Sequence, residues 1–302
     1  MKISYSAPAK VILSGEHAVV YGKPALVSAI NLRLIFTISS RSSKDGRLDK
    51  EILFISKEVK KYLINQKINF VDKPFSFEID SKIPIGRGLG SSAALSVASV
   101  AAFLDFYSGK QFEKKIINNL AYQIEKYFHQ NPSGVDNSSA CFGGLIFYKK
   151  KVGLNKLDFK IPKNFEDKLF LIDSGKPKET TGEMVDFVRT SVNKKILNKI
   201  EKTVNKLVIS IKNEDKVLFK KCLVNNEKLL EKLEVVSEKT KKLLINLSKF
   251  GFGKVTGAGG RKTDSGFILF FTEDKAKLEK FLKRKKISYY YFVPDYNGLQ
   301  KI

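Results

Sequence analysis

Apolar and polar residues alternate in short runs along much of the chain, a pattern that predicts β-strands separated by turns. The clearest alternation runs from Arg33 to Ile38. The runs KISYSAP (2–8) and KVILSGE (10–16) contain residues that favour β-strands and are interrupted by turn residues such as Pro8. Strands are expected at positions 2–8, 10–16, 24–40, 76–80, 143–150, 167–175, 266–272 and 288–293.

Apolar residues three and four positions apart predict helices elsewhere. Helices are expected at positions 91–107, 112–128 and 274–286, and as a series over 181–250. The first half of the chain mixes strands with helices, whereas the second half opens with helices and ends in a strand–helix–strand pattern.

The predicted fold class is α+β, with two domains at 1–168 and 169–302 and a boundary zone between Pro162 and Gly182. No proline- or serine-rich linker marks that zone, so the two domains are expected to pack closely. With 43% apolar residues, a chain of 302 residues can bury a full core.

The charge balance is strongly basic, with 55 Lys and Arg against 31 Asp and Glu and a net charge of +24. Such a balance is typical of proteins that meet nucleic acid, an anionic membrane surface or polyanionic substrates. The basic residues are mostly Lys, are spread along the chain, and do not interleave with aromatic residues in a nucleic-acid motif. We therefore expect a solvated basic surface with a mild preference for anions, and neither a nucleic-acid nor a membrane partner.

Cysteine use and hydropathy predict a cytoplasmic protein. Cys141 and Cys222 are far apart and lack metal-ligand spacing, which favours a reducing compartment. The N-terminal residues lack the long apolar core of a signal peptide. The longest uncharged run, 88–104, is short for a membrane span and rich in Ser, Gly and Ala.

The stretch KIPIGRGLGSSAALSVASVAAF, positions 82–103, is the first candidate for chemistry. Its glycines allow backbone N–H groups to approach a ligand closely, and Ser91 is a natural N-cap for the helix that follows. A glycine loop that leads into a helix N-terminus is suited to bind a phosphate. The alternative is a tight turn that only caps a buried helix. The spacing matches neither the Walker pattern nor the dinucleotide fingerprint.

Two carboxylates form the second candidate group. Asp136 lies in NPSGVDN, where it either caps a turn or takes part in chemistry, and Glu125 is either a surface residue or a ligand. Phosphoryl transfer needs Mg²⁺, which prefers hard oxygen ligands, and a group that orients or deprotonates the attacking hydroxyl. A hydroxyl at a helix N-terminus and two carboxylates from another segment would supply both needs.

Basic residues near the start of the chain complete the candidate set. Lys10 is either a solvated charge or the partner of an aspartate that it keeps ionised. His17 is one of two histidines, and it has either a structural or a catalytic role. The other histidine, His129, has no His or Cys at ligand spacing, so a His/Cys metal site is not expected.

These segments together resemble the GHMP kinases. GLGSSAA is similar to the phosphate loop of that superfamily, and KVILSGEHAVVYGKPAL, NPSGVDN and KVTGAGG are most similar to the motifs of its mevalonate kinase branch. The resemblance is scattered over residues 3–270. It implies an N-terminal α/β domain and a C-terminal ferredoxin-like α+β domain, with the active site in the cleft between them. It also implies ATP-dependent phosphorylation of mevalonate to 5-phosphomevalonate, with Mg²⁺ as cofactor, in a homodimer.

The resemblance assigns roles by position. Asp136 matches the catalytic aspartate and Lys10 the lysine that pairs with it, while Ser92, in preference to Ser91, and Glu125 match the Mg²⁺ ligands. The residues expected to bind ATP are Pro84, Gly86, Arg87, Gly88, Leu89, Gly90, Ser91, Ser92 and Ala93. The residues expected at the substrate are Lys10, Glu16, His17, Asp136, Thr180, Gly257, Ala258 and Gly259.

The sequence departs from the family pattern at three places, and none of them removes a proposed catalytic group. Ala9 stands where glycine is usual, Arg87 lies inside the phosphate loop, and RKTDSG follows the last glycine motif. Arg261 and Lys262 in that segment either contact phosphate or alter the loop, and Arg87 meets either a phosphate or solvent.

Two competing hypotheses remain. One is a kinase of the same fold that acts on another small hydroxylated substrate, namely phosphomevalonate, mevalonate at another hydroxyl, or a sugar. The other is a nucleic-acid-binding protein on a kinase scaffold, which the net charge favours and the intact set of Lys10, Ser92, Glu125 and Asp136 opposes.

Overall fold

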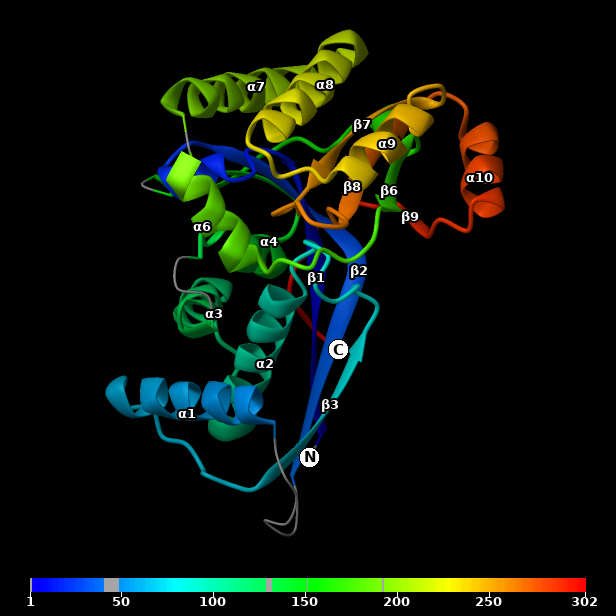
Figure 1. Cartoon of the computed structure of the whole chain (residues 1–302). Helices are drawn as coiled ribbons and strands as arrows, with labels where there is room; N and C mark the ends of the chain where they lie inside the picture. The colour runs from blue at the N-terminus through cyan, green and yellow to red at the C-terminus, as the bar shows by residue number, and fades with distance from the viewer. Residues whose placement is uncertain (1, 41–48, 129–131, 151, 192) are drawn as a thin grey trace.

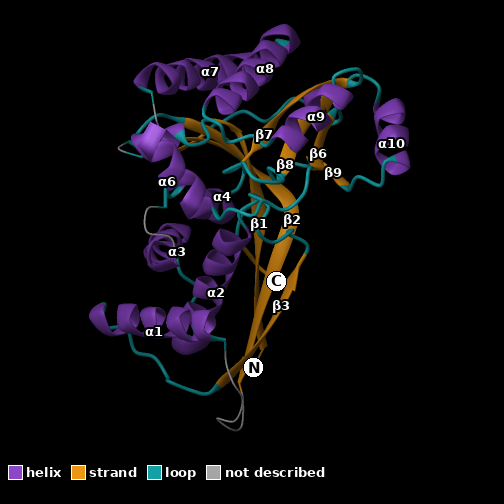
Figure 2. Cartoon of the chain, viewed as in Figure 1, coloured by secondary structure: helices purple, strands orange, loops and turns teal. Residues whose placement is uncertain are grey.

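Two antiparallel sheets, one for each lobe, organise the molecule (Figure 1). The computed structural model describes residues 2–40, 49–128, 132–150, 152–191 and 193–302. We use "N-terminal lobe" for the first sheet together with helices α1 to α4. We use "C-terminal lobe" for the second sheet together with helices α5 to α10. Figure 2 shows the helices of the N-terminal lobe stacked beside its long strands.

The first sheet is built on a long hairpin. Its strands are β1 (Lys2–Ser14), β2 (Ala25–Ser40), β3 (Phe75–Ser81), β4 (Leu145–Lys149), β5 (Gly153–Lys156) and β10 (Gln300–Lys301). The strand order in the described residues is β10-β1-β2-β4-β5, and β3 pairs with the far end of β2.

The expectation of two separate strands at 2–8 and 10–16 is wrong, because β1 runs unbroken from Lys2 to Ser14. A register shift between Pro8 and Ala9 lets the strand continue past a residue that has no N–H to donate. One strand therefore carries the chain from the distal end of the sheet to the junction between the lobes.

The helices of the N-terminal lobe surround a central apolar helix. They are α1 (Lys50–Asn65), α2 (Ser91–Ser108), α3 (Lys114–Phe128) and α4 (Val135–Phe142). Helix α2 packs on β1, β2 and the other three helices. In the described chain it alone is long and apolar enough to cross a membrane, and 78% of that window is buried inside the protein. Its apolar surface on all sides fits the centre of a core.

The patterning does not predict α1, which has clear local signals. Asp49 precedes the helix, and its carboxylate accepts hydrogen bonds from the backbone N–H groups of Glu51 and Ile52. Ile55 and Val59 are buried on the same face as Ile52, at helical spacing.

The second sheet has the ferredoxin-like order β7-β8-β6-β9 in the described residues. Its strands are β6 (Leu169–Asp173), β7 (Gly251–Thr256), β8 (Phe267–Thr272) and β9 (Tyr289–Tyr291). The helices of this lobe are α6 (Thr181–Ser191), α7 (Lys194–Lys212), α8 (Lys216–Lys232), α9 (Glu238–Leu247) and α10 (Lys275–Arg284). The short helix α5 (Lys163–Glu166) precedes β6. Within the described part of 181–250, the predicted helical series corresponds to α6, α7, α8 and α9.

After β9 the chain returns to the N-terminal lobe. β10 pairs with β1, so the two termini lie near each other (Figure 1). Arg33 on β2 forms an ion pair with the buried Asp295 and also donates to the backbone oxygens of Ser6 and Gly298. These contacts fasten the chain after β9 to the first sheet.

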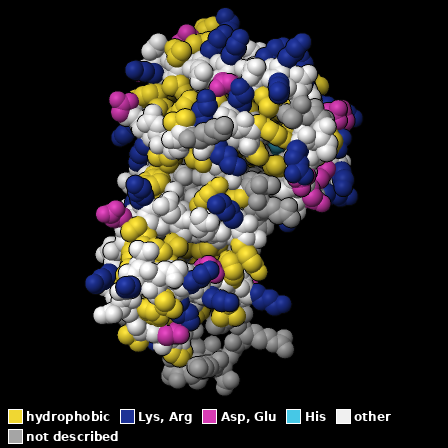
Figure 3. All heavy atoms as spheres, turned by 90° about the vertical axis from the view of Figure 1, so that its left-hand side faces the viewer, with side chains coloured by type: hydrophobic (Ala, Val, Ile, Leu, Met, Phe, Trp, Pro, Cys, Tyr) yellow, Lys and Arg dark blue, Asp and Glu magenta, His cyan; other side chains and the backbone are white. Residues whose placement is uncertain are grey.

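The basic residues do not gather in one place on the face shown in Figure 3. Lys and Arg side chains lie singly or in small groups over both lobes, separated by hydrophobic and uncharged surface. That distribution resembles the solvated basic surface that the sequence predicts.

Candidate active site

The glycine-rich segment forms the loop between β3 and α2. Gly86, Gly88 and Gly90 all have positive φ, at 71°, 85° and 78°, a region that residues with a side chain rarely adopt. Gly90 is the N-cap of α2, and no side chain caps the helix. The expectation that Ser91 is the cap is wrong, because the chain enters the helix through a left-handed turn. The first turn of α2 is therefore suited to receive an anion.

Lys10 lies along the end of this loop. Its backbone N–H donates to the Leu89 carbonyl oxygen over 2.9 Å, and a Cβ added to Gly90 would lie 2.9 Å from Lys10 Cγ. The glycine at position 90 thus makes room for the lysine side chain.

The Lys10 ammonium meets Asp136, with 3.2 Å between Nζ and Oδ1. The Lys10 side chain is 4% exposed, whereas that of Asp136 is 38% exposed. Asp136 stands in the first turn of α4, which begins after Gly134 at φ 85°. The turn predicted in NPSGVDN therefore continues into a short helix, and its first residue, Asn131, lies outside the described part of the chain. The Asp136 carboxylate is therefore paired with a buried ammonium group and is itself accessible to solvent.

Glu125 on α3 is buried against the start of α2. Its Oε1 accepts hydrogen bonds from Ser92 Oγ at 2.8 Å and from Ser96 Oγ at 2.9 Å. Glu125 is 5% exposed, so the alternative of a surface glutamate does not hold. Ser96, one turn after Ser92, is a polar residue of this group that the sequence analysis did not single out.

Glu16 lies just beyond β1, between the lobes, with its side chain fully buried. Its carboxylate forms an ion pair with Lys254 on β7 and accepts a 3.1 Å hydrogen bond from the Asn226 amide on α8. Lys254 also donates to the Ile12 carbonyl oxygen at 3.0 Å. Burial lowers the pKa of Lys254, against the opposing effect of Glu16. Glu16 thus contacts the C-terminal lobe, and the sequence analysis missed its two partners.

His17 is the next residue and also reaches the other lobe. Its Nε2 lies 3.0 Å from the Ala258 carbonyl oxygen, and Nδ1 is buried without a hydrogen-bond partner in the described chain. Burial lowers the pKa of His17 to about 4, so the imidazole is neutral at physiological pH. The backbone of His17 has φ 57° and begins the 3-10 helix η1 (Ala18–Tyr21).

The glycine motif after β7 approaches the phosphate loop. A Cβ added to Gly257, at φ 84°, would lie 3.0 Å from Gly88 Cα. Gly259 passes the Val235 carbonyl oxygen, which an added Cβ would meet at 2.1 Å. The segment 257–259 therefore brings the C-terminal lobe against the loop.

Thr180 occupies the start of α6, where its backbone N–H donates to Glu183 Oε2 at 2.7 Å and its hydroxyl accepts from the Glu183 N–H at 3.2 Å. This reciprocal pair is a capping box. Thr180 is exposed, and within the described residues it forms no hydrogen bond with Lys10 or Asp136.

Arg261 and Lys262 belong to the altered loop. Both backbone N–H groups donate to Glu179 Oε1, and the Arg261 guanidinium lies 3.5 Å from the Phe187 ring centroid and pairs with Glu234. Those contacts hold the RKTDSG segment on α6 and the turn before α9.

Comparison with known proteins places this geometry in a family. The model for the GHMP kinases N terminal domain matches residues 55–144. The mevalonate kinase of Methanocaldococcus jannaschii is 32% identical over 299 residues, which cover 89% of this chain and 92% of that protein. The mevalonate kinase of Archaeoglobus fulgidus is 32% identical over 267 residues, which cover 84% and 88%.

The chain belongs to the mevalonate kinase family of the GHMP kinases. The crystal structure of the M. jannaschii mevalonate kinase agrees over 96% of both chains, with a TM-score of 0.80 and 28% identity. The GHMP kinase fold expected from the motifs is thereby confirmed. In this family, the loop at 84–93 and the Lys10–Asp136 pair are considered together as parts of one candidate site.

Proposed function

We propose that this chain transfers the terminal phosphoryl group of ATP to the primary hydroxyl of mevalonate. Membership of the mevalonate kinase family supports the reaction. The observation that carries the proposal is the Lys10–Asp136 pair, which sits beside the phosphate loop with the carboxylate on the solvent side. That combination is suited to phosphoryl transfer, because the attacking hydroxyl must be positioned in line with the leaving oxygen of the phosphoryl group.

Asp136 is the group proposed to receive or orient the hydroxyl proton of mevalonate. Lys10 holds this carboxylate in one position, since its ammonium is buried and lies 3.2 Å from it. We assign the ATP phosphates to the loop 84–93, whose glycines and uncapped helix start present backbone N–H groups.

Ser92 and Glu125 are the proposed Mg²⁺ ligands. Their hard oxygens lie 2.8 Å apart, and no group of three or more His, Cys, Asp or Glu side chains in the described residues could form an all-protein cage. This donor set fits Mg²⁺, which takes few protein ligands and keeps water and phosphate oxygens. When bound, the ion neutralises charge on the phosphate oxygens.

The substrate side is proposed to include His17, Thr180 and the segment 257–259. The buried Nδ1 of His17 supports this proposal because it has no partner in the described chain. For Glu16 the buried pair with Lys254 supports an indirect role, in which it fixes the position of neighbouring His17 between the lobes.

Purified protein with ATP and MgCl₂ should be tested against mevalonate, 5-phosphomevalonate, homoserine and galactose, with ADP release followed and products identified by mass. Turnover with mevalonate that yields the 5-phosphate supports the proposal. ADP release with another acceptor alone would overturn the assigned substrate.

We also infer a cytoplasmic homodimer from the family resemblance. Cys141 and Cys222 are free and buried, in keeping with a reducing compartment. Light scattering on the purified protein tests the dimer, and a monomeric mass would refute it.

A further inference from the structure

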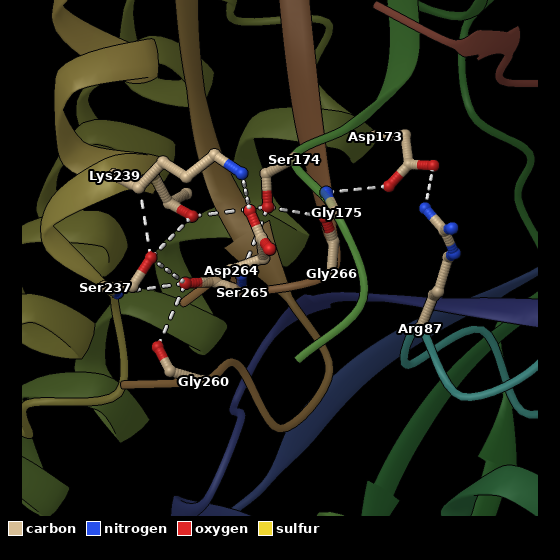
Figure 4. Close-up of polar contacts among 11 residues, drawn as sticks. Arg87, Asp173, Ser174, Gly175, Ser237, Lys239, Gly260, Asp264, Ser265 and Gly266 are labelled. Atoms are coloured by element: carbon tan, nitrogen blue, oxygen red, sulfur yellow. Dashed lines mark hydrogen bonds and ion pairs between the residues drawn. The ribbon is translucent and has the colours of Figure 1, made fainter. Parts of the chain in front are cut away.

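Arg87, at the centre of the phosphate loop, is bound by a carboxylate of the other lobe. Its Nη1 donates to Asp173 Oδ2, at the end of β6 (Figure 4). Asp173 is itself fixed, because its Oδ1 accepts a 2.9 Å hydrogen bond from the Gly175 N–H. The arginine is therefore held by a carboxylate that the backbone of the C-terminal lobe keeps in place.

The backbone around Arg87 is enclosed by the C-terminal lobe. A Cβ added to Gly266 would lie 2.8 Å from the Arg87 carbonyl oxygen, and one added to Gly88 would lie 3.2 Å from the Thr256 carbonyl oxygen. Lys176, also from the C-terminal lobe, lies against Gly86, where an added Cβ would be 2.8 Å from Lys176 Cε. Because the loop backbone is confined in this way, only the long Arg87 side chain could change its position in the loop, and Asp173 restricts that side chain.

The guanidinium has binding capacity that the ion pair does not use. Arginine carries five N–H donors, and among the described residues Asp173 is the one hydrogen-bond partner of the Arg87 side chain. The Arg87 side chain is 30% exposed and that of Asp173 is 13% exposed. A cation with free donors in a loop that faces phosphate is suited to a bidentate contact with phosphate oxygens.

We propose that Asp173 is a positioning residue for nucleotide binding, which holds Arg87 so that its remaining N–H groups bind a phosphate of ATP. The inference rests on the proposed function, since it takes the loop as the ATP site. The ion pair with Asp173 already restricts the Arg87 side chain before ATP binds. Binding ATP therefore costs less conformational entropy than it would for a free arginine between two glycines. In this arrangement the C-terminal lobe, and not the loop alone, sets the affinity for ATP.

Two other roles of the Arg87–Asp173 pair predict different effects on ATP binding, and the experiment below distinguishes them. If the Asp173 carboxylate competed with phosphate for the guanidinium, its removal would strengthen ATP binding. If the ion pair only joined the lobes, its loss would lower stability with no specific effect on ATP.

The test is a double-mutant cycle on ATP affinity, measured by calorimetry with ATP and MgCl₂ and no acceptor. The variants are Arg87→Ala, Asp173→Asn, the double variant and Arg284→Ala, which removes an arginine from α10 as a control for charge. Asn at position 173 retains an oxygen for the Gly175 N–H. Thermal melting followed by circular dichroism checks that each variant folds.

We expect Arg87→Ala to weaken ATP binding about tenfold, as for loss of one charge-assisted contact. Asp173→Asn should weaken it about fivefold when Arg87 is present and not at all in the Arg87→Ala background. The kcat for mevalonate at saturating ATP should stay within about twofold in Asp173→Asn. Arg284→Ala should bind ATP as the unmodified protein does.

Unchanged or tighter ATP binding by Asp173→Asn overturns the inference, and so does equal weakening in both backgrounds. Failure of the unmodified protein to bind ATP also overturns it. If that protein binds ATP but does not phosphorylate mevalonate, the proposed function fails while the cycle still decides the role of Asp173.

Discussion

Glu16 and Lys254 form an ion pair between the two lobes in which neither side chain has exposed surface. One partner follows β1 and the other lies on β7, and Asn226 on α8 completes the contact. Removing one partner of such a pair leaves a buried charge without compensation. The motif that contains Glu16 and His17 thus joins the lobes as well as lying near the site.

We predict that Lys254→Met lowers the free energy of unfolding by about 3–5 kcal/mol, because it leaves the Glu16 carboxylate buried and unpaired. Chemical denaturation monitored by circular dichroism measures this loss. The Glu16→Gln/Lys254→Met double variant should recover part of it.

The matched control is Lys23→Met, which removes a second ion pair between the lobes. Lys23 and Glu201 on α7 are about one quarter exposed, at 26% and 25%, with 2.7 Å between the charged atoms. Its loss should cost under about 1 kcal/mol. Equal losses from Lys23→Met and Lys254→Met would contradict the special role of burial.

Asp136→Asn should keep the fold and the affinity for ATP but lower kcat by about 10²–10⁴-fold, since the amide cannot accept the hydroxyl proton. Steady-state ADP release with mevalonate measures the rate, and calorimetry measures ATP binding. Near-normal turnover would rule out the assigned role. A loss of ATP binding of the same size would instead point to a structural role for the Lys10–Asp136 pair.

The sequence predicted those parts of the site that depend on local chain geometry. Glycines at 86, 88 and 90 indicated a loop that leads into a helix, and the structure has that loop. The family motifs then pointed to Lys10 with Asp136 and to Ser92 with Glu125, pairs that the structure brings together.

The sequence did not predict contacts between distant segments. Lys254 and Glu16 are separated by 238 positions, and no local pattern indicates that they meet. The pairing of Arg87 with Asp173 depends in the same way on how the lobes dock. For α1 a local signal is present in Asp49 and in the apolar spacing from Ile52 to Val59, but the predicted elements do not include this helix.

Ser92→Ala should raise the Mg²⁺ concentration needed for half-maximal activity by about tenfold or more, because it removes a proposed ligand. Ser96→Ala is the matched control, since Ser96 donates to the same Glu125 oxygen from one turn deeper in α2. We expect a smaller shift for Ser96→Ala. Titration of turnover with MgCl₂ at fixed ATP measures both, and equal shifts would contradict the assignment of Ser92 as the ligand.

Glu227 on α8 makes stability depend on pH. Burial raises its pKa to about 7, against the effect of a hydrogen bond from the Val255 N–H, and the second oxygen is buried without a partner in the described chain. In the unfolded chain the pKa is 4.5. Between pH 4.5 and 7 the folded state therefore binds more protons than the unfolded state, and stability falls as the pH rises.

Glu227→Gln removes this dependence, because the amide stays neutral at every pH. We expect the stability of the unmodified protein, relative to Glu227→Gln, to fall by up to about 3 kcal/mol from pH 4.5 to 7.5 and to change little above pH 8. Urea denaturation at a series of pH values gives the difference.

His17 contributes the opposite slope over part of this range. Its folded pKa is about 4 against 6.5 in the unfolded chain, so its contribution to stability is lost as the pH falls through that interval. Both proteins in the comparison contain His17, and the subtraction therefore cancels it. A difference that stays constant from pH 4.5 to 7.5 would show that Glu227 ionises at its ordinary pKa in the folded protein, with water reaching the carboxylate that the structure shows buried.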